Sequence, residues 1–115
     1  SQEAIVDLKK VSSLSQEMLN DAMNIFDSRN VNTLLPLLNE KEKRLNELEI
    51  VCRQNHFDRM KENICDNSFA SSVILDILSL LEGIGDLALD IANCSLILYK
   101  NHEKKFLDPD EILVK

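Results

Sequence analysis

The fold is decided by the stretch from residue 74 to residue 99, which reads ILDILSLLEGIGDLALDIANCSLILY. Apolar and small residues recur there every three or four positions, namely at Ile74, Leu78, Leu81, Gly85, Ala88, Ala92, Ser95 and Tyr99. This spacing places them on one face of an α-helix, because a helix completes a turn in 3.6 residues. The helix is expected to run from about residue 69 to residue 105. Pro109 then places residues 107–115 in a C-terminal tail.

Two earlier stretches have the same periodicity and predict two more helices. The first spans about residues 3–27, with a core stripe of Ala4, Leu8, Val11, Met18, Ala22 and Ile25. The second spans about residues 32–64, with a core stripe of Leu34, Leu38, Leu45, Leu48 and Cys52. Asn32 is the expected N-cap of the second helix, and Pro36 is expected inside its first turn, where a missing N–H is tolerated. We expect seven residues to be largely buried: Leu8, Leu45, Leu48, Phe69, Ile74, Leu78 and Leu81.

Composition excludes the main alternatives to a helical fold. The chain has 115 residues, which suffices for one domain with a core, and it contains only 2 Gly and 2 Pro. A β-sandwich or barrel needs more turn residues, and phosphate-binding loops need more glycines. We therefore predict an all-α fold, an elongated antiparallel three-helix bundle over residues 1–106, followed by the tail 107–115.

Charge and cysteine content narrow the classes of function. The net charge of −7 argues against nucleic acid and against an anionic membrane surface as partners, and no apolar run is long enough to insert into a bilayer. Cys52, Cys65 and Cys94 are an odd number without C-x-x-C spacing, which predicts reduced cytosolic thiols in or near the core. Because the chain starts at Ser1 without Met, we expect it to be a domain of a longer protein.

The third helix has an unusual charge pattern. Residues 62–99 contain no Lys or Arg but six acidic residues. Three of these acids, Glu82, Asp86 and Asp90, are four residues apart, so their like charges stack on one helix face and destabilise it. Both glycines also lie here: Gly85 continues a small-residue seam for close packing, whereas packing within the bundle does not explain Gly83.

The second helix carries polar residues at the matching edge of its own apolar stripe. In an antiparallel hairpin centred near Asp66, Asn46 is expected beside Asp86, Glu42 beside Asp90, and Glu49 beside Glu82. The result is a cluster of five carboxylates and one amide, to which Arg53 is the nearest cation.

Such a cluster is costly unless it is protonated, paired or metal-bound. The prediction is a metal site formed by Glu42, Asn46, Glu82 and Asp86. All-oxygen ligands suit Mg, Ca, Mn or Fe, and the sequence does not identify the ion. The alternative is a solvated acidic face. The isolated domain is expected to hold such a metal weakly or not at all.

At these same residues the chain resembles the PhoU family of phosphate-uptake regulators. Residues 80–92, LLEGIGDLALDIA, are similar to the family motif L-E-R-I-G-D-H-A-x-N-I-A, and residues 42–46 are similar to its first acidic motif, E/D-x-x-x-D. The resemblance covers about residues 1–103. The chain departs from the family at four positions: Gly83 replaces Arg, Leu87 replaces His, Asp90 replaces Asn, and Asn46 replaces the second acid.

The resemblance implies a PhoU-like, spectrin-like up-down-up bundle and a regulatory role in phosphate uptake without enzymatic activity. Some family members carry metal clusters at these motifs. A single repeat is similar to the cytoplasmic domain of bacterial sodium–phosphate cotransporters. The expected partners are a membrane transporter domain of the same chain, a phosphate-signalling protein, or a second copy. The expected location is the cytoplasm, at the cytoplasmic face of the inner membrane if the domain belongs to a transporter.

The residues argue against two other helical functions and leave one alternative open. A helical enzyme of the chorismate mutase type needs several basic groups for its dicarboxylate substrate, and the third helix has none between residues 62 and 99. A histidine-phosphotransfer domain needs an exposed His in an H-x-x-K-G setting, which His56 and His102 lack; both are expected at the surface or at a helix end. The rival to a phosphate regulator is a helical dimerisation or docking module without a metal or phosphate role.

Overall fold

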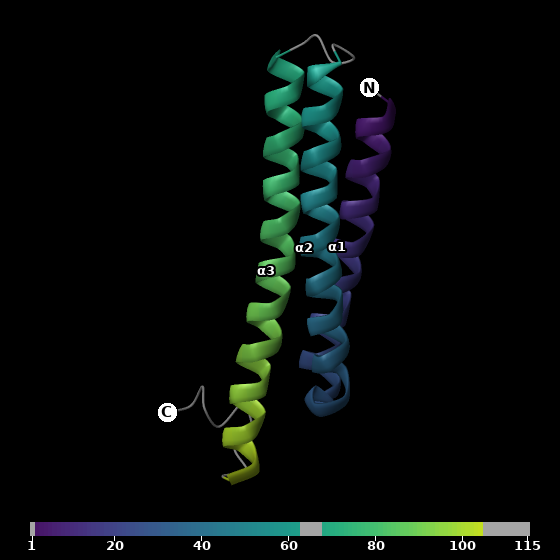
Figure 1. Cartoon of the computed structure of the whole chain (residues 1–115). Coiled ribbons are helices and arrows are strands. Elements are labelled where there is room, and N and C mark those ends of the chain that lie inside the picture. The colour runs from purple at the N-terminus through teal and green to yellow at the C-terminus, as the bar shows by residue number, and fades with distance from the viewer. Residues whose placement is uncertain (1, 63–67, 105–115) are drawn as a thin grey trace.

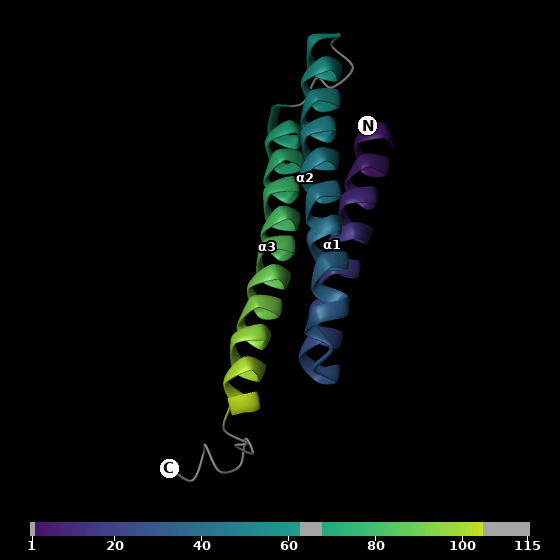
Figure 2. The same ribbon diagram turned by 60° about the horizontal axis from the view of Figure 1, so that its bottom comes forward.

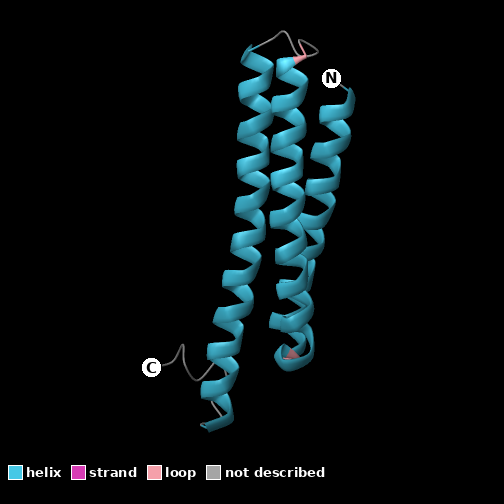
Figure 3. Cartoon of the chain, in the orientation of Figure 1, coloured by secondary structure: helices cyan, strands magenta, loops and turns pink. Residues whose placement is uncertain are grey.

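A computed structural model describes residues 2–62 and 68–104 of the chain, and these form three helices (Figure 1). The helices are α1 (Gln2–Ser28), α2 (Val31–Lys61) and α3 (Ser68–Lys104). The described residues contain no strand (Figure 3). The predicted all-α three-helix fold is therefore confirmed. The tail 107–115 and the residues between α2 and α3 lie outside the described part of the chain.

The helices form an elongated bundle of 61 × 27 × 15 Å. Successive helices run in opposite directions, so α1 and α3 are parallel to each other and α2 is antiparallel to both (Figures 1 and 2). The C-terminal end of α3 extends beyond the turn that joins α1 to α2, which both views show. This elongated shape follows from long helices joined by short connections.

The turn between α1 and α2 differs from the prediction in its details. Arg29 has a positive φ of 60°, which turns the chain sharply after α1. Asn30, and not Asn32, occupies the N-cap position of α2, and its side chain makes no capping hydrogen bond. Pro36 consequently lies in the second turn of α2, where it removes an N–H that would bond the carbonyl of Asn32. The predicted end of this helix near Ile64 lies outside the described residues; α2 ends at Lys61.

The core lies along the line where the three helices meet. Its fully buried members include Val11, Met18, Ala22, Ile25, Leu38, Leu45, Leu78, Ala88 and Ala92. Of the seven residues expected to be largely buried, Leu45 and Leu78 are so, Leu8, Leu48, Ile74 and Leu81 are partly buried, and Phe69 lies outside the described side chains. Three rods enclose only a narrow core, so residues one step from the centre of a stripe keep some contact with solvent.

The small-residue seam on α3 has the packing role that was predicted. A Cβ atom at Gly85 would overlap Cδ2 of Leu45 and would lie 3.4 Å from Sδ of Met18, so α1 and α2 both approach α3 closely here. At Gly83 a Cβ atom would meet nothing within 4 Å. Cys52 is buried as expected, whereas Cys94 is exposed, and Cys65 lies outside the described residues. Along the described helices no segment has enough uncharged apolar length to cross a bilayer.

Candidate functional site

The predicted site residues lie on the facing sides of α2 and α3. Glu42 and Glu82 are partly buried, whereas Asn46 and Asp86 are exposed. Two further acids behave differently from each other: Glu49 is buried, and Asp90 is exposed. The antiparallel pairing of α2 with α3 therefore brings acids from the two helices together, but only part of the predicted cluster leaves bulk solvent.

Glu49 and Glu82 form the centre of this acidic cluster. A hydrogen bond with Glu49 raises the pKa of Glu82, and burial and the charges of Glu49 and Asp86 raise it further. The two carboxyl groups therefore lie close together between α2 and α3, where the charged form of Glu82 is disfavoured. Arg53, one helical turn after Glu49 on α2, partly offsets the negative charge of this pair. Its Nε donates to Glu49 Oε1 at 2.8 Å, and its terminal nitrogen donates to Ser79 Oγ at 3.0 Å. The predicted neighbours Glu49 and Glu82, and Arg53 as the nearest cation, are confirmed.

Glu42 occupies a second part of the cluster, beside Gly85. Its Oε2 atom is buried and has no hydrogen-bond partner among the described residues, and it would lie 3.5 Å from a Cβ atom at Gly85. Burial raises the pKa of Glu42, the charge of Asp86 raises it further, and a hydrogen bond with Asn46 lowers it. Asp86, and not the predicted Asp90, is thus the first acidic neighbour of Glu42, because the long Glu42 side chain reaches back over the glycine.

The cluster has the oxygen donors that hard metal ions prefer, but its side chains do not converge on one point. Within the described residues no group of three or more His, Cys, Asp or Glu side chains is placed to hold a metal ion. Arg53 already pairs with Glu49. A metal ion bound by Glu49 would have to displace this ion pair.

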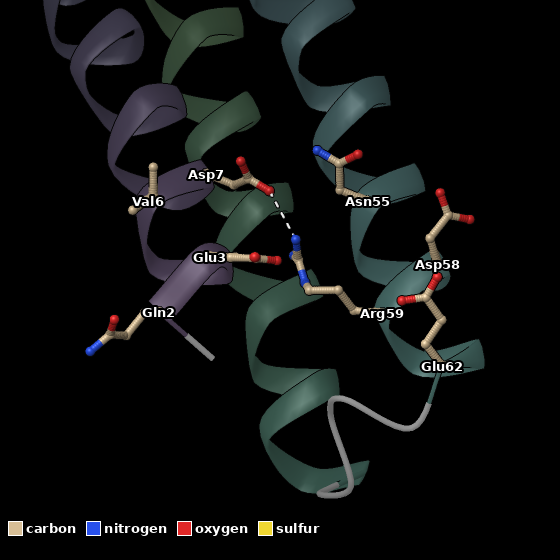
Figure 4. A pocket seen from close by; sticks show the side chains of 8 residues that line it. All are labelled: Gln2, Glu3, Val6, Asp7, Asn55, Asp58, Arg59 and Glu62. Carbon is tan, nitrogen blue, oxygen red and sulfur yellow. Dashed lines mark hydrogen bonds and ion pairs between the residues drawn. The ribbon is translucent and has the colours of Figure 1, made fainter.

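A second polar region lies at the end of the bundle where α1 begins and α2 ends. A cavity of about 660 Å³ opens there between the two helices, lined by Gln2, Glu3, Val6, Asp7, Asn55, Asp58, Arg59 and Glu62 (Figure 4). Arg59 crosses from α2 toward α1 and pairs with Asp7, with 3.4 Å between its terminal nitrogen and Oδ2. Arg59 is buried, and its Nε atom has no hydrogen-bond partner among the described residues.

His56 lies next to this ion pair and corrects the prediction that it would be a surface or helix-end residue. Only 1% of His56 is exposed, and its Nε2 atom is 2.6 Å from Ser71 Oγ on α3. Ser71 donates its own proton to Met60 Sδ, so we assign the imidazole proton to Nε2. Burial lowers the pKa of His56, and the charge of Arg59 lowers it further. A buried, neutral imidazole cannot accept a phosphoryl group from a partner, which excludes a phosphotransfer role for His56. His102 lies outside the described side chains.

This second region was not predicted, although the sequence contains a signal for it. Arg59 follows Leu38, Leu45 and Cys52 at intervals of seven residues, so a charged residue continues the most buried line of α2. Asp7 stands seven residues before the buried Leu14. A heptad position that changes from apolar to charged on two neighbouring helices predicts a buried ion pair.

The comparisons with known proteins give one match. A family model described as the PhoU domain matches residues 8–95, which include α2, most of α1 and α3, the acidic cluster and the residues from His56 to Arg59. No curated protein and no solved structure matches the chain. Because the matched residues make up most of the chain and the bundle is the one that the resemblance implied, this chain belongs to the PhoU family.

Proposed function

We propose that this chain is a regulatory or accessory module of phosphate uptake that acts through contact of its helix faces with a transporter or a signalling protein. The observation that carries the proposal is the PhoU match over residues 8–95. PhoU domains have a general role in the regulation of phosphate transport, and the family is not one of enzymes.

The more specific proposal is that the module belongs to the cytoplasmic part of a sodium–phosphate cotransporter or of a related regulator. The similarity of a single three-helix repeat to such domains supports it. Its partner would then be a transporter domain of the same chain or a phosphate-signalling protein at the cytoplasmic face of the membrane. Residues 1–106 would be the functional unit.

A genetic deletion tests this function. Residues 1–106 are removed from the protein in its cell, and phosphate uptake is followed at high and at low external phosphate. We expect uptake to lose its dependence on external phosphate. Unchanged uptake and unchanged regulation in both conditions would contradict the proposal and would leave the docking module as the remaining interpretation.

A metal ion bound by Glu42, Asn46, Glu82 and Asp86 stays a separate prediction. The supporting observation is chemical: the donors are oxygen atoms, which Mg, Ca, Mn and Fe(II) accept. Calorimetric titration with these four ions should give heat with the wild type and none with the Glu82→Gln/Asp86→Asn variant. The Glu40→Gln/Glu47→Gln variant is the matched control, because it removes two exposed acids elsewhere on α2. Equal binding by all three proteins, or binding by none, would contradict a metal site here.

A second candidate function is a helical dimerisation or docking module. The observation in its favour is the large number of exposed apolar side chains on α1 and α3, among them Leu19, Met23, Phe26, Leu80, Leu87 and Ile97. A single soluble bundle rarely leaves so many large apolar residues in water without a partner. This function does not exclude the first, because a regulator also needs a docking surface.

A further inference from the structure

The structure points to a self-docking surface: we propose that two copies of this chain associate through the face that α1 and α3 share, with the helices of one copy antiparallel to those of the other. This inference deepens the docking part of the proposed function and identifies the partner as a second copy. It does not depend on the role in phosphate transport, since association is measured on the purified chain.

The first observation is a complete apolar stripe on the outer side of α3. It consists of Val73, Ile77, Leu80, Ile84, Leu87, Ile91, Cys94 and Leu98. Successive members are alternately four and three residues apart, which is the spacing of a coiled-coil seam, and none of them is charged. Leu80 is 70% exposed and Leu87 is 60% exposed, so the described part of the chain leaves these two side chains near the middle of the stripe largely uncovered.

A second stripe runs along α1. It contains Ile5, Leu8, Ser12, Leu19, Met23 and Phe26, and its large members Ile5, Leu19, Met23 and Phe26 are exposed. Neither stripe faces α2. On α3 the stripe lies roughly 170° around the helix from Ser71, which contacts His56 of α2, and roughly 110° from Ser79, which contacts Arg53 of α2. On α1 it lies roughly 150° from Asp7 and Asp21, which pair with α2.

The two stripes therefore border one groove and form a single face. α1 and α3 contact each other along this line, because Ser15 Oγ donates to the carbonyl of Leu81 at 3.0 Å and the Tyr99 hydroxyl donates to the carbonyl of Phe26. The face is about 38 Å long over residues 73–98 and about 20 Å wide across two helices. Its area of roughly 700 Å² is close to the ~800 Å² per partner that a stable protein interface buries.

The geometry of the stripes favours a second copy over an unrelated occupant. When α3 is paired antiparallel with itself, every stripe position meets another: Val73 meets Leu98, Ile77 meets Cys94, Leu80 meets Ile91, and Ile84 meets Leu87. The stripe on α1 matches itself in the same way about Ser15 and Gln16. An isologous interface requires such self-matching about a twofold axis.

Both stripes can use the same twofold axis. The middle of the α1 stripe lies at Ser15, and the middle of the α3 stripe lies at Gly85. Contacts place these midpoints within about one helical turn of each other, because Ser15 bonds to Leu81 and Met18 Sδ would lie 3.4 Å from a Cβ atom at Gly85. One axis perpendicular to the helices therefore relates α1 to α1 and α3 to α3 of the second copy.

Gly83 gives independent support. A glycine inside a helix costs about 1 kcal/mol relative to alanine, and no atom of the described residues lies within 4 Å of a Cβ atom at this position. Gly83 stands beside the middle of the α3 stripe, next to the twofold axis. A second helix that approaches here accounts for the missing side chain.

The test is sedimentation equilibrium of the chain over a concentration range from about 1 to 500 μM. We expect the wild type to dimerise and the Leu80→Glu/Leu87→Glu variant to lose roughly a hundredfold or more in association constant. Ile50→Glu is the matched control, because Ile50 is 67% exposed but lies on α2, and it should dimerise like the wild type. Circular dichroism establishes that all three proteins keep their helices.

A cross-link tests the orientation. In a Cys65→Ser background, the Ile77→Cys variant should form a disulfide with Cys94 of the second copy on mild oxidation with diamide, and Ile50→Cys should not. A wild type that stays monomeric at 500 μM, whether or not it binds vesicles or a transporter domain, overturns the proposal. So does a dimer that survives Leu80→Glu/Leu87→Glu, or one in which Ile77→Cys gives no cross-link.

Discussion

The two polar regions of this bundle bury charge in opposite ways. At the end where α1 begins, Asp7 and Arg59 meet as charges of opposite sign. In the middle, Glu49 and Glu82 meet as groups of the same charge sign, with Arg53 on one side. The first arrangement holds two helices together, whereas the second is a local cost that protonation relieves. Removal of a charge should therefore destabilise the bundle at its end and stabilise it in its middle.

The largest expected effect is at the Asp7–Arg59 pair. Asp7→Asn should lower the free energy of unfolding by about 3 kcal/mol, because Arg59 would remain buried without a carboxylate. The control is Glu17→Gln, which removes a partner of Lys41 that is 57% exposed and should cost less than about 0.5 kcal/mol. Urea unfolding of both variants measures the difference. A loss below about 1 kcal/mol for Asp7→Asn would mean that the pair does not hold α1 to α2.

The two glycines beside the acidic cluster should respond with opposite sign. Gly85→Ala should destabilise the bundle by about 1 kcal/mol. The reason is that the overlap of its Cβ atom with Leu45 costs more free energy than the higher helix propensity of alanine supplies. Gly83→Ala should stabilise by about 1 kcal/mol, because nothing lies near its Cβ. Thermal unfolding at a concentration that keeps the chain monomeric measures both. A stabilising Gly85→Ala would show that Leu45 gives way freely.

The next effect is a pH dependence from His56. Its folded pKa lies below the ordinary value of 6.5, so the unfolded chain binds the proton more readily. The contribution of His56 to stability is complete above pH 6.5 and is lost as the pH falls below that value. The His56→Gln variant should show a flatter decline in unfolding free energy between pH 6.5 and pH 5 than the wild type. Parallel declines in the two proteins would contradict a buried neutral imidazole.

The smallest effect is at Glu82, with the opposite sign in pH. Its folded pKa is raised above 4.5, so its contribution to stability is complete below pH 4.5 and is lost as the pH rises through the folded value. Glu82→Gln imitates the protonated form and should stabilise the bundle by a few tenths of a kcal/mol at pH 7, as removal of a like-charge neighbour does. The gain should vanish below pH 4.5. Glu47→Gln, which replaces an exposed acid, is the control.

The acidic cluster was predictable in its membership and less so in its geometry. The absence of Lys and Arg between residues 62 and 99, together with the antiparallel register, was enough to place Glu49 beside Glu82 and Arg53 near both. The same reasoning placed Glu42 beside Asp90, but the structure gives it Asp86 as its first acidic neighbour. The register of two helices fixes where the Cα atom of a glutamate lies, and its three side-chain torsions decide where its carboxylate lies.

The details of the turn between α1 and α2 and the burial of His56 could not be predicted from the spacing of apolar residues either. Asn32 has the chemistry of an N-cap, yet the helix begins earlier because Arg29 adopts a positive φ and turns the chain before it. The expected surface position of His56 was wrong for a different reason. Ser71, fifteen residues away on another helix, supplies the hydrogen bond that allows the imidazole to be buried.

The sequence by itself determined the number of helices, their approximate limits, the antiparallel order and the line of small and apolar residues on which they pack. These features depend on periodicity within one helix, and periodicity is a local property of the chain. Only the tertiary structure decided which polar residues meet, namely Arg59 with Asp7 and His56 with Ser71, and that the carboxylate of Glu42 lies in the space beside Gly85. It also decided that the apolar stripes of α1 and α3 lie on one exposed face. These contacts join residues far apart in sequence, so they depend on how each helix is rotated about its axis when the three helices pack around one core.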